Sequence, residues 1–131
     1  MKISIVTATY NSGATVRDTL ESVLRQNYKN YELIIKDGGS TDNTLAICRE
    51  YEPVFEGRMK IISCADKGLY DAMNQGYQLS TGDVIVFFND VFTESAVVSK
   101  MVSLIENAPD CVGAHADLVY KEGDTVRRYW K

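Results

Sequence analysis

The chain has 131 residues, of which 45% are hydrophobic and 24% are charged, and its formal net charge is -4. This composition is typical of one globular domain that is large enough to bury a core, and it excludes a disordered chain. A nucleic-acid-binding surface needs clustered Lys and Arg, whereas the basic residues here are scattered. No nucleic-acid partner is therefore expected.

The longest apolar stretch, residues 84–88, is far shorter than the roughly 20 residues that cross a bilayer. Met1-Lys2 is followed by a strand pattern and not by a signal sequence, so we expect a cytoplasmic protein. The three cysteines lack CxxC spacing, which favours neither a disulfide framework nor a zinc site, and we expect them to be buried. The single histidine, His115, excludes multi-histidine metal sites.

Hydrophobic periodicity predicts strands and helices in alternation. Four apolar runs predict strands at residues 3–6, 31–36, 60–63 and 83–88. Two further strands, at residues 112–120 and 126–130, are separated by Lys121-Glu122-Gly123-Asp124, which predicts a hairpin. The fold class is therefore α/β, with a mostly parallel sheet, helices on both faces and an antiparallel edge hairpin.

One helix is predicted after each of the first four strands. The first covers residues 16–24, and the second begins near Ser40 or Thr41 and ends before Pro53. The third covers residues 69–79, and the fourth follows Thr93, a candidate N-cap, and ends before Pro109. No linker or repeat divides the chain, so we expect residues 1–131 to form one domain.

Loops that follow parallel strands lie along one edge of the sheet, where ligands bind in open α/β folds. The first such loop, Thr7-Ala8-Thr9-Tyr10-Asn11, combines small hydroxyls, an aromatic ring and an amide, which suit a nucleobase. Asp37 begins the second loop and has acceptors for the imide N–H of a uracil. The alternative is that these residues only form turns, and Asp42 is expected to stabilise a helix start.

The third loop, Asp66-Lys67-Gly68, places a cation and a glycine before a predicted helix, which suits a diphosphate. The fourth, Asn89-Asp90, offers oxygen ligands to Mg²⁺ or Mn²⁺ that bridges a diphosphate. Each motif alone is also an ordinary turn. The prediction of a ligand site therefore depends on the four loops together.

Together the loops resemble the nucleotide-sugar half of the family 2 glycosyltransferases, inverting enzymes with the GT-A fold. The resemblance extends from residue 2 to about residue 130 and includes Ser22-Val23-Leu24-Arg25-Gln26, Asp37-Gly38-Gly39-Ser40-Thr41-Asp42, Asp66-Lys67-Gly68-Leu69-Tyr70-Asp71-Ala72-Met73-Asn74 and Thr81-Gly82-Asp83-Val84-Ile85. It is strongest to bacterial members that act in polysaccharide and cell-envelope assembly. This implies a nucleotide-diphosphate sugar donor, preferentially a UDP-sugar, and a saccharide or lipid-linked acceptor.

The resemblance also implies roles for individual residues. Thr7 and Tyr10 would frame the base, Asp37 would bind it, and Asp90 would hold Mg²⁺ or Mn²⁺. The nucleotide-sugar-binding residues expected in full are Thr7, Ala8, Tyr10, Asn11, Asp37, Asp66, Lys67, Gly68, Asn74 and Asn89. The family typically has a longer Asn-x-Asp-Asp run where this chain has Phe88-Asn89-Asp90-Val91-Phe92, which is two residues shorter and has one carboxylate fewer.

Family members usually continue into an acceptor-binding half that carries the catalytic carboxylate. The resemblance therefore implies that this chain is the donor-binding part, and Asp117 is the one weak candidate for a general base, with a hydrogen-bonded strand Asp as the better interpretation. Exposed apolar surface would then favour a homo-oligomer. Peripheral association of the full-length protein with the inner face of the membrane is also expected.

Three other protein classes are alternatives for an α/β chain of this kind. A phosphoacceptor signalling domain needs an acidic cluster for Mg²⁺, but the first strand ends in Thr7-Ala8-Thr9. A dinucleotide-dependent oxidoreductase needs GxGxxG at the first turn, where Gly13 stands alone. A noncatalytic nucleotide-binding or assembly module stays open, and nucleotide binding without turnover would indicate it.

Overall fold

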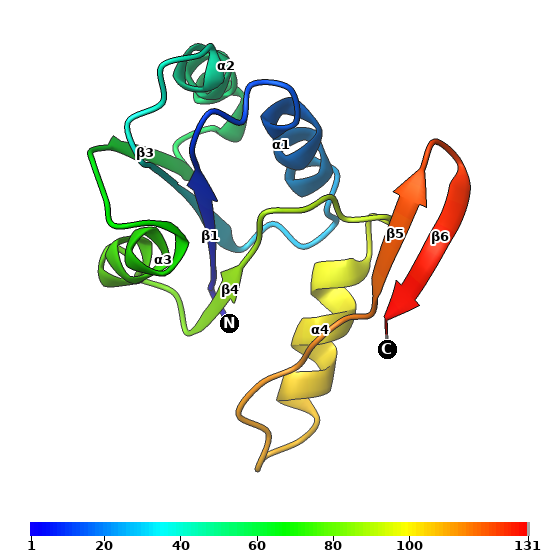
Figure 1. Cartoon of the computed structure of the whole chain (residues 1–131). Coiled ribbons are helices and arrows are strands. Elements are labelled where there is room, and N and C mark those ends of the chain that lie inside the picture. The colour runs from blue at the N-terminus through cyan, green and yellow to red at the C-terminus, as the bar shows by residue number, and fades with distance from the viewer. Residues whose placement is uncertain (131) are drawn as a thin grey trace.

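The computed structural model describes residues 1–130, and for Trp130 the backbone only. Its centre is a parallel sheet of four strands in the order β3-β2-β1-β4 (Figure 1). The strands are β1 (Ile3–Thr9), β2 (Tyr31–Asp37), β3 (Met59–Ser63) and β4 (Val84–Phe87). The predicted α/β class with a mostly parallel sheet is confirmed.

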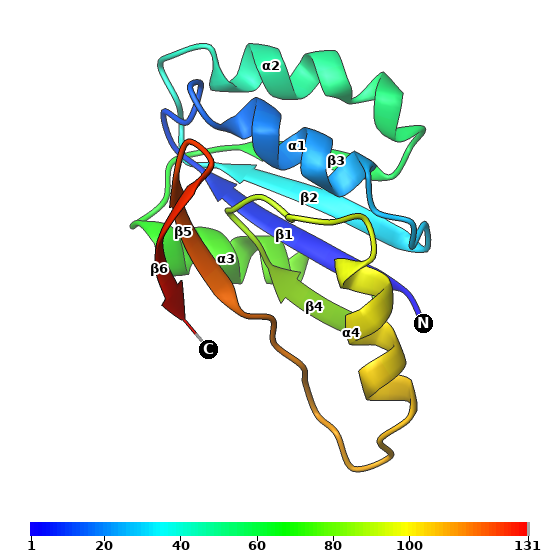
Figure 2. The ribbon, with the colours of Figure 1, turned by 90° about the vertical axis from the view of Figure 1, so that its right-hand side faces the viewer.

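Helices cover both faces of this sheet (Figure 2). Helices α1 (Val16–Leu24) and α2 (Thr44–Tyr51) lie on one face, and α3 (Leu69–Gln78) lies on the other. A short 3-10 helix, η1 (Pro53–Phe55), follows α2, and α4 (Val97–Glu106) follows β4. Each crossover helix returns the chain to the amino end of the next parallel strand, so all four strands end at one edge.

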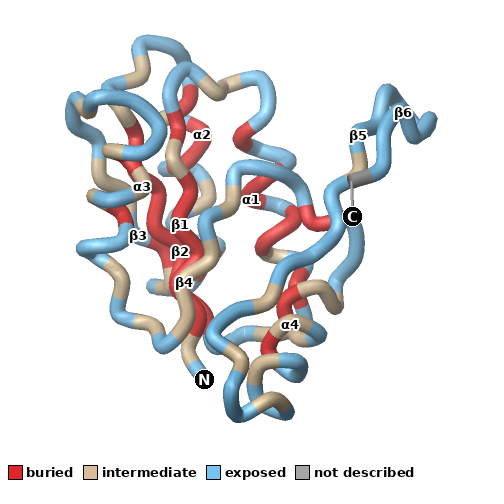
Figure 3. Tube along the Cα trace, turned by 60° about the horizontal axis from the view of Figure 1, so that its bottom comes forward, coloured by how far each residue is buried: buried red, intermediate tan, exposed pale blue. Residues whose placement is uncertain are grey.

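The main core lies between the sheet and α1, α2 and α4. Alternate residues of the central strands point into it, and Figure 3 shows the buried positions concentrated along β1 and β2. The apolar side chains that fill this core include Ile3, Ile5, Val16, Leu20, Val23, Leu33, Ile35, Ile47, Val98 and Val102. On the other face α3 approaches β1 so closely that a Cβ at Gly76 would lie 2.4 Å from a methyl carbon of Val6.

Strands β5 (Leu118–Glu122) and β6 (Thr125–Trp130) form the predicted antiparallel hairpin, with Gly123 at a positive φ of 60° in its turn. The hairpin is a two-stranded sheet separate from the four-stranded sheet (Figure 1). The prediction that its first strand starts at residue 112 is wrong. Residues 112–117 have no regular structure, and Val112 is fully exposed, so burial does not stabilise a strand there.

Two helices begin later than the sequence predicts, and side chains bind the backbone at both observed starts. Helix α2 begins at Thr44, whose N–H donates to the carboxylate of Asp42 at 3.0 Å. Helix α4 begins at Val97 and not after Thr93. The buried amide of Gln26 binds this entrance, since it accepts from the N–H of Val98 at 3.1 Å and donates to the carbonyl of Glu94 at 2.8 Å.

The cysteines differ from the expectation of uniform burial. Cys48 is buried, Cys111 is half-buried and Cys64 is exposed, and all three thiols are free. Burial raises the pKa of the Cys48 thiol to about 11. Across residues 1–130, no helix combines the length and the apolar character that crossing a membrane requires.

Candidate functional site

The parallel register aligns the ends of the strands. Thr9, at the end of β1, lies opposite Asp37, at the end of β2, and Asp37 lies opposite Ser63, at the end of β3. Strand β4 runs parallel on the other side of β1. The four polar loops predicted from the sequence therefore start from one edge of the sheet, which we call the carboxyl edge.

The first two loops are hydrogen-bonded to each other through Asn11. This residue has a left-handed φ of 48°, and its N–H donates to the Ser40 hydroxyl at 2.8 Å. Its side-chain oxygen accepts the N–H of Thr41 at 2.9 Å, and the N–H of Gly13 donates to Asp42 at 2.9 Å. The oxygen of Asn11 that was expected to meet a nucleotide is therefore used inside the protein.

Asp37 is buried completely and its carboxylate is occupied by protein donors. It accepts from the hydroxyl of Thr9 at 3.0 Å and of Ser63 at 2.9 Å. The amides of Gly39 and Ser40 donate at 3.0 and 2.8 Å, and the Ser40 hydroxyl donates as well. Burial alone would raise the pKa of Asp37, but these hydrogen bonds, those of Ser40 first, lower it below the usual range.

These contacts give Asp37 a role inside the protein. A carboxylate with five donors and no exposed surface has no lone pair directed at a ligand. It stabilises the turn after β2, which is the alternative that the sequence left open. Direct contact between Asp37 and a base is therefore not what this geometry supports.

Asp66, in the third loop, is also paired within the protein. Its carboxylate accepts from the ammonium of Lys36 at 3.0 Å and from the N–H of Gly68 at 3.0 Å. The hydrogen bond from Lys36, followed by that from Gly68, holds the pKa of Asp66 below its usual range. Sequence reasoning missed Lys36, although a lysine inside an apolar strand that is buried on both faces needs a partner.

The third loop still presents positive charge at the carboxyl edge. The side chain of Lys67 is exposed, and its ammonium has no hydrogen bond or ion pair to residues 1–130. Gly68 has a φ of 110° and directly precedes α3, whose N-terminus carries partial positive charge. Asn74 is exposed on the same helix. Lys67, Gly68 and Asn74 are thus exposed, and their roles in ligand binding stay predictions.

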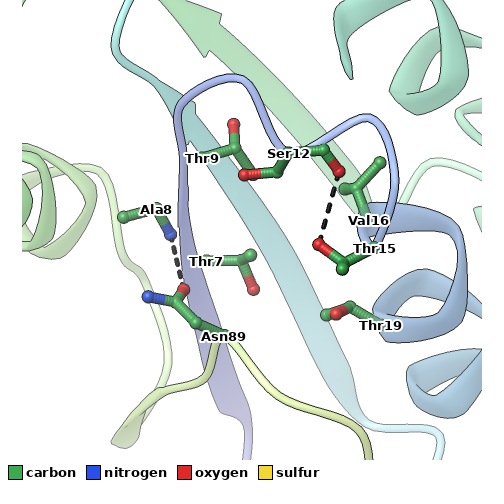
Figure 4. Close-up of a pocket in the computed structure, with 8 residues that line it drawn as sticks. All are labelled: Thr7, Ala8, Thr9, Ser12, Thr15, Val16, Thr19 and Asn89. Carbon is green, nitrogen blue, oxygen red and sulfur yellow. Dashed lines mark hydrogen bonds between the residues drawn. The ribbon is translucent and has the colours of Figure 1, made fainter. Parts of the chain in front are cut away.

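A polar cavity of about 180 Å³ lies between β1 and α1 (Figure 4). Asn89, from the fourth loop, reaches it and accepts the N–H of Ala8 at 2.9 Å. The hydroxyl of Thr7 donates to the carbonyl of Phe88 at 2.6 Å. No charged side chain lines the cavity, whose residues are Thr7, Ala8, Thr9, Ser12, Thr15, Val16, Thr19 and Asn89. The structure thus brings the predicted residues Thr7, Ala8 and Asn89 together.

The fourth loop offers one carboxylate to a cation. Asp90 is exposed, and residues 1–130 contain no group of three or more His, Cys, Asp or Glu side chains arranged to hold a metal ion. Mg²⁺ commonly takes one or two carboxylates and completes its coordination with phosphate oxygens and water. Asp90 therefore fits a cation that arrives with a diphosphate and does not form a metal site alone.

Tyr10 and Asp117 are the two remaining predicted site residues. The ring of Tyr10 is 64% exposed at the carboxyl edge. Asp117 directly precedes β5 and accepts from the hydroxyl of Tyr129 at 3.3 Å, which is a contact with the hairpin. The structure does not bring Asp117 together with the four loops, so its role as a base stays a prediction.

Comparison with known proteins agrees with this architecture. The sequence profile described as "Glycosyl transferase family 2" matches residues 4–131. The chain belongs to this family. A PGL/p-HBAD biosynthesis glycosyltransferase of Mycobacterium tuberculosis is 37% identical over 128 residues, which are 95% of this chain and 47% of that protein. Glycosyltransferase AglE of Haloferax volcanii is 28% identical over 95% of this chain and 42% of its own length.

Solved structures show the same fold. TarS 1-349 of S. aureus in complex with UDP-GlcNAc matches with a TM-score of 0.74 and 24% identity, over 82% of this chain and 32% of the TarS 1-349 chain. The mannosyltransferase PcManGT of Pyrobaculum calidifontis, in complex with GDP-Man and Mn²⁺, matches with a TM-score of 0.70 and 20% identity, over 77% of this chain and 31% of its own. The GT-A fold is thus confirmed. This family 2 chain spans about half the length of its curated relatives.

Proposed function

We propose that this chain is the donor-binding part of a glycosyltransferase that moves a sugar, of hexose type, from a nucleotide diphosphate to a saccharide or lipid-linked acceptor with inversion. Family membership gives the transferase class. The observation that carries the donor site is the alignment of four polar loops along the carboxyl edge. This edge is where open α/β folds bind nucleotides.

The parts of a donor fit different parts of this edge. The exposed ring of Tyr10 offers a stacking surface for the base, beside the small residue Ala8. Lys67 and the N-terminus of α3 suit the diphosphate, because both supply positive charge. The neutral cavity that Thr7 and Asn89 line suits hydroxyl groups of the ribose or of the sugar.

We further propose that Mg²⁺ or Mn²⁺ joins the donor at Asp90. A divalent cation supplies charge neutralisation to a departing diphosphate. Two similar structures contain Mn²⁺: PcManGT with GDP-Man, and a glucosyl-3-phosphoglycerate synthase of Mycobacterium tuberculosis with UDP. The first of these has a guanine nucleotide, so the preference of this chain for uridine is a separate element of the proposal.

A second candidate is a noncatalytic nucleotide-binding module. It is favoured by one observation, that Asp117, the one candidate base, accepts a hydrogen bond from Tyr129 of the hairpin. Both candidates predict nucleotide binding, and only the transferase predicts release of UDP from a UDP-sugar. For the complete protein, a role in cell-envelope polysaccharide assembly, a location at the inner membrane face and a homo-oligomeric state also belong to the proposal.

A thermal-shift screen tests the donor site. UDP, GDP and ADP are each added to the chain with and without Mn²⁺, and ligands that bind the folded state raise its melting temperature. We expect UDP with Mn²⁺ to give the largest increase. Tyr10→Ala should reduce it, whereas Tyr77→Ala, which removes another exposed ring near the far end of α3, should not. No response to any nucleoside diphosphate would contradict the proposal.

A further inference from the structure

The ammonium of Lys36 is buried at the end of β2, with its side chain 0% exposed. It donates to three oxygens: the carbonyl of Asp37 at 2.9 Å, the carbonyl of Cys64 at 2.8 Å and the carboxylate of Asp66 at 3.0 Å. An ammonium has three donors, and here each has an acceptor. Lys36 therefore connects the end of β2 to the loop that follows β3.

Asp66 extends this connection to the start of α3. One carboxylate oxygen of Asp66 binds Lys36 and the other accepts the N–H of Gly68. The first of these oxygens lies 2.8 Å from where a Cβ at Gly38 would be, so the third loop packs directly on the turn after β2. The position of Gly68, and with it of Lys67 and the N-terminus of α3, thus depends on the Lys36–Asp66 pair.

The pair also determines the charge that a ligand meets. Asp37 and Asp66 place two carboxylates near this part of the carboxyl edge, and a nucleoside diphosphate is itself anionic. Interactions between neighbouring charges are strong where water is excluded. With Lys36 paired to Asp66, the neighbouring charge of Lys67 and the helix N-terminus is left to attract the diphosphate.

We propose that Lys36 is a positioning residue for the diphosphate of the donor, because it neutralises Asp66 and holds the third loop in place without touching the ligand. This inference rests on the proposed function. A residue that only stabilised the fold would affect the binding of charged and neutral ligands alike. Loss of the lysine should weaken binding of charged ligands more than binding of neutral ones.

The test compares UDP with uridine in NMR titrations of four chains: wild type, Lys36→Met, Asp66→Asn and the double variant. Lys36→Met should lower the affinity for UDP roughly tenfold, a change equivalent to about 1.4 kcal/mol. It should lower the affinity for uridine less than about twofold. In the double variant the unpaired carboxylate is gone, but so is the pair that holds the third loop, so the affinity for UDP should recover only in part, to between that of Lys36→Met and that of the wild type. Lys60→Met removes a cation from the same face of the sheet, far from the carboxyl edge, and should change neither affinity.

Amide hydrogen exchange without ligand gives an independent readout. Lys36→Met and Asp66→Asn should both accelerate exchange at residues 64–68, with the Gly68 amide affected most, because its acceptor is Asp66. If Lys36→Met does not fold, Asp66→Asn alone should accelerate this exchange and change the affinity for UDP more than the affinity for uridine.

Three results would overturn the inference: equal losses for UDP and uridine, no recovery in the double variant, or unchanged exchange at residues 64–68. If the wild-type chain binds no nucleotide, the proposed function fails and the diphosphate role of Lys36 fails with it. The exchange data would then still report whether the Lys36–Asp66 pair holds the third loop.

Discussion

The hydroxyl of Thr9 donates a hydrogen bond of 3.0 Å to the carboxylate of Asp37, and these residues are the last of β1 and β2. The bond joins the two central strands where both leave the sheet. Ser63, at the end of β3, donates to the same carboxylate at 2.9 Å. One buried group thus fixes the ends of three neighbouring strands, so the carboxyl edge is built before any ligand binds.

Asp37→Asn should destabilise the fold strongly. An amide presents an NH₂ group to hydroxyl and N–H donors that now meet a carboxylate oxygen, so buried donors lose their acceptor. We expect the free energy of unfolding to fall by about 2–4 kcal/mol, measured by urea denaturation. Asp110→Asn, on an exposed turn, should change it by less than about 0.5 kcal/mol. A variant of unchanged stability that lost only its preference for UDP would instead restore the role of Asp37 as a base contact.

Protonation of Glu32 in acid should lower the stability of the folded chain. Burial of Glu32 raises its pKa, but hydrogen bonds from Ser4, Thr81 and Lys60 outweigh burial and lower the pKa to about 2, from an ordinary value of 4.5. Because the folded pKa is the lower one, the stabilisation is complete above pH 4.5 and is lost as the pH falls toward 2. Denaturation midpoints between pH 7 and pH 2.5 measure this dependence.

Glu32→Gln should flatten that pH profile and lower stability at pH 7 by about 1–3 kcal/mol, because the buried hydrogen bonds lose a charged acceptor. Glu50→Gln is the matched control, since Glu50 is exposed and pairs with Arg17 on the surface. An acid profile that is the same in wild type and Glu32→Gln would show that other groups cause the acid sensitivity.

Gly76→Ala should destabilise the chain even though alanine is the better helix former. The new Cβ would lie 2.4 Å from Cγ1 of Val6, so α3 must move away from β1. Overpacking of this kind typically costs about 1–3 kcal/mol, more than the roughly 1 kcal/mol gained in helix propensity. A Cβ at Gly113 meets nothing within 4 Å, so Gly113→Ala should be neutral. Equal thermal melting of both variants would contradict the close packing of α3 on β1.

Metal should bind only together with the diphosphate. Asp90 is the one carboxylate that the fourth loop offers, so Mn²⁺ alone should give no thermal shift, and UDP should bind more tightly in its presence. Asp90→Asn should remove this enhancement, roughly tenfold in affinity, and keep the metal-free affinity for UDP. Asp124→Asn, in the hairpin turn, is the control. Enhancement that survives Asp90→Asn would mean that the cation is held elsewhere.

The fold was largely predictable because each strand and helix carries its own hydrophobic period. Burial also extended β1 and β2 to Thr9 and Asp37, beyond the predicted limits. The positions of the four loops followed from the parallel sheet, but the partners of their side chains did not. Asp37 and Asn11 bind neighbours that are distant in the sequence, and local patterns do not reveal whether a carboxylate or an amide is already satisfied inside the protein.

Lys36 is a second residue whose partner could not be predicted from the sequence. Its position in an apolar strand indicates a buried charge, but Asp66 lies 30 residues further along the chain. Only the pairing of β2 with β3 brings the two together. Residues whose contacts are local, such as Gly68 before α3, were predicted more easily because the helix start itself defines their role.

The most direct test of the donor site is an NMR titration of the isotope-labelled chain with UDP and Mg²⁺, which follows every backbone amide. We predict that the shifts gather in the loops after β1, β3 and β4, at Ala8, Tyr10, Lys67, Gly68 and Asn89, and leave the hairpin of β5 and β6 unchanged. Shifts confined to the amino edge of the sheet or to the hairpin, or no shifts at millimolar UDP, would contradict the account.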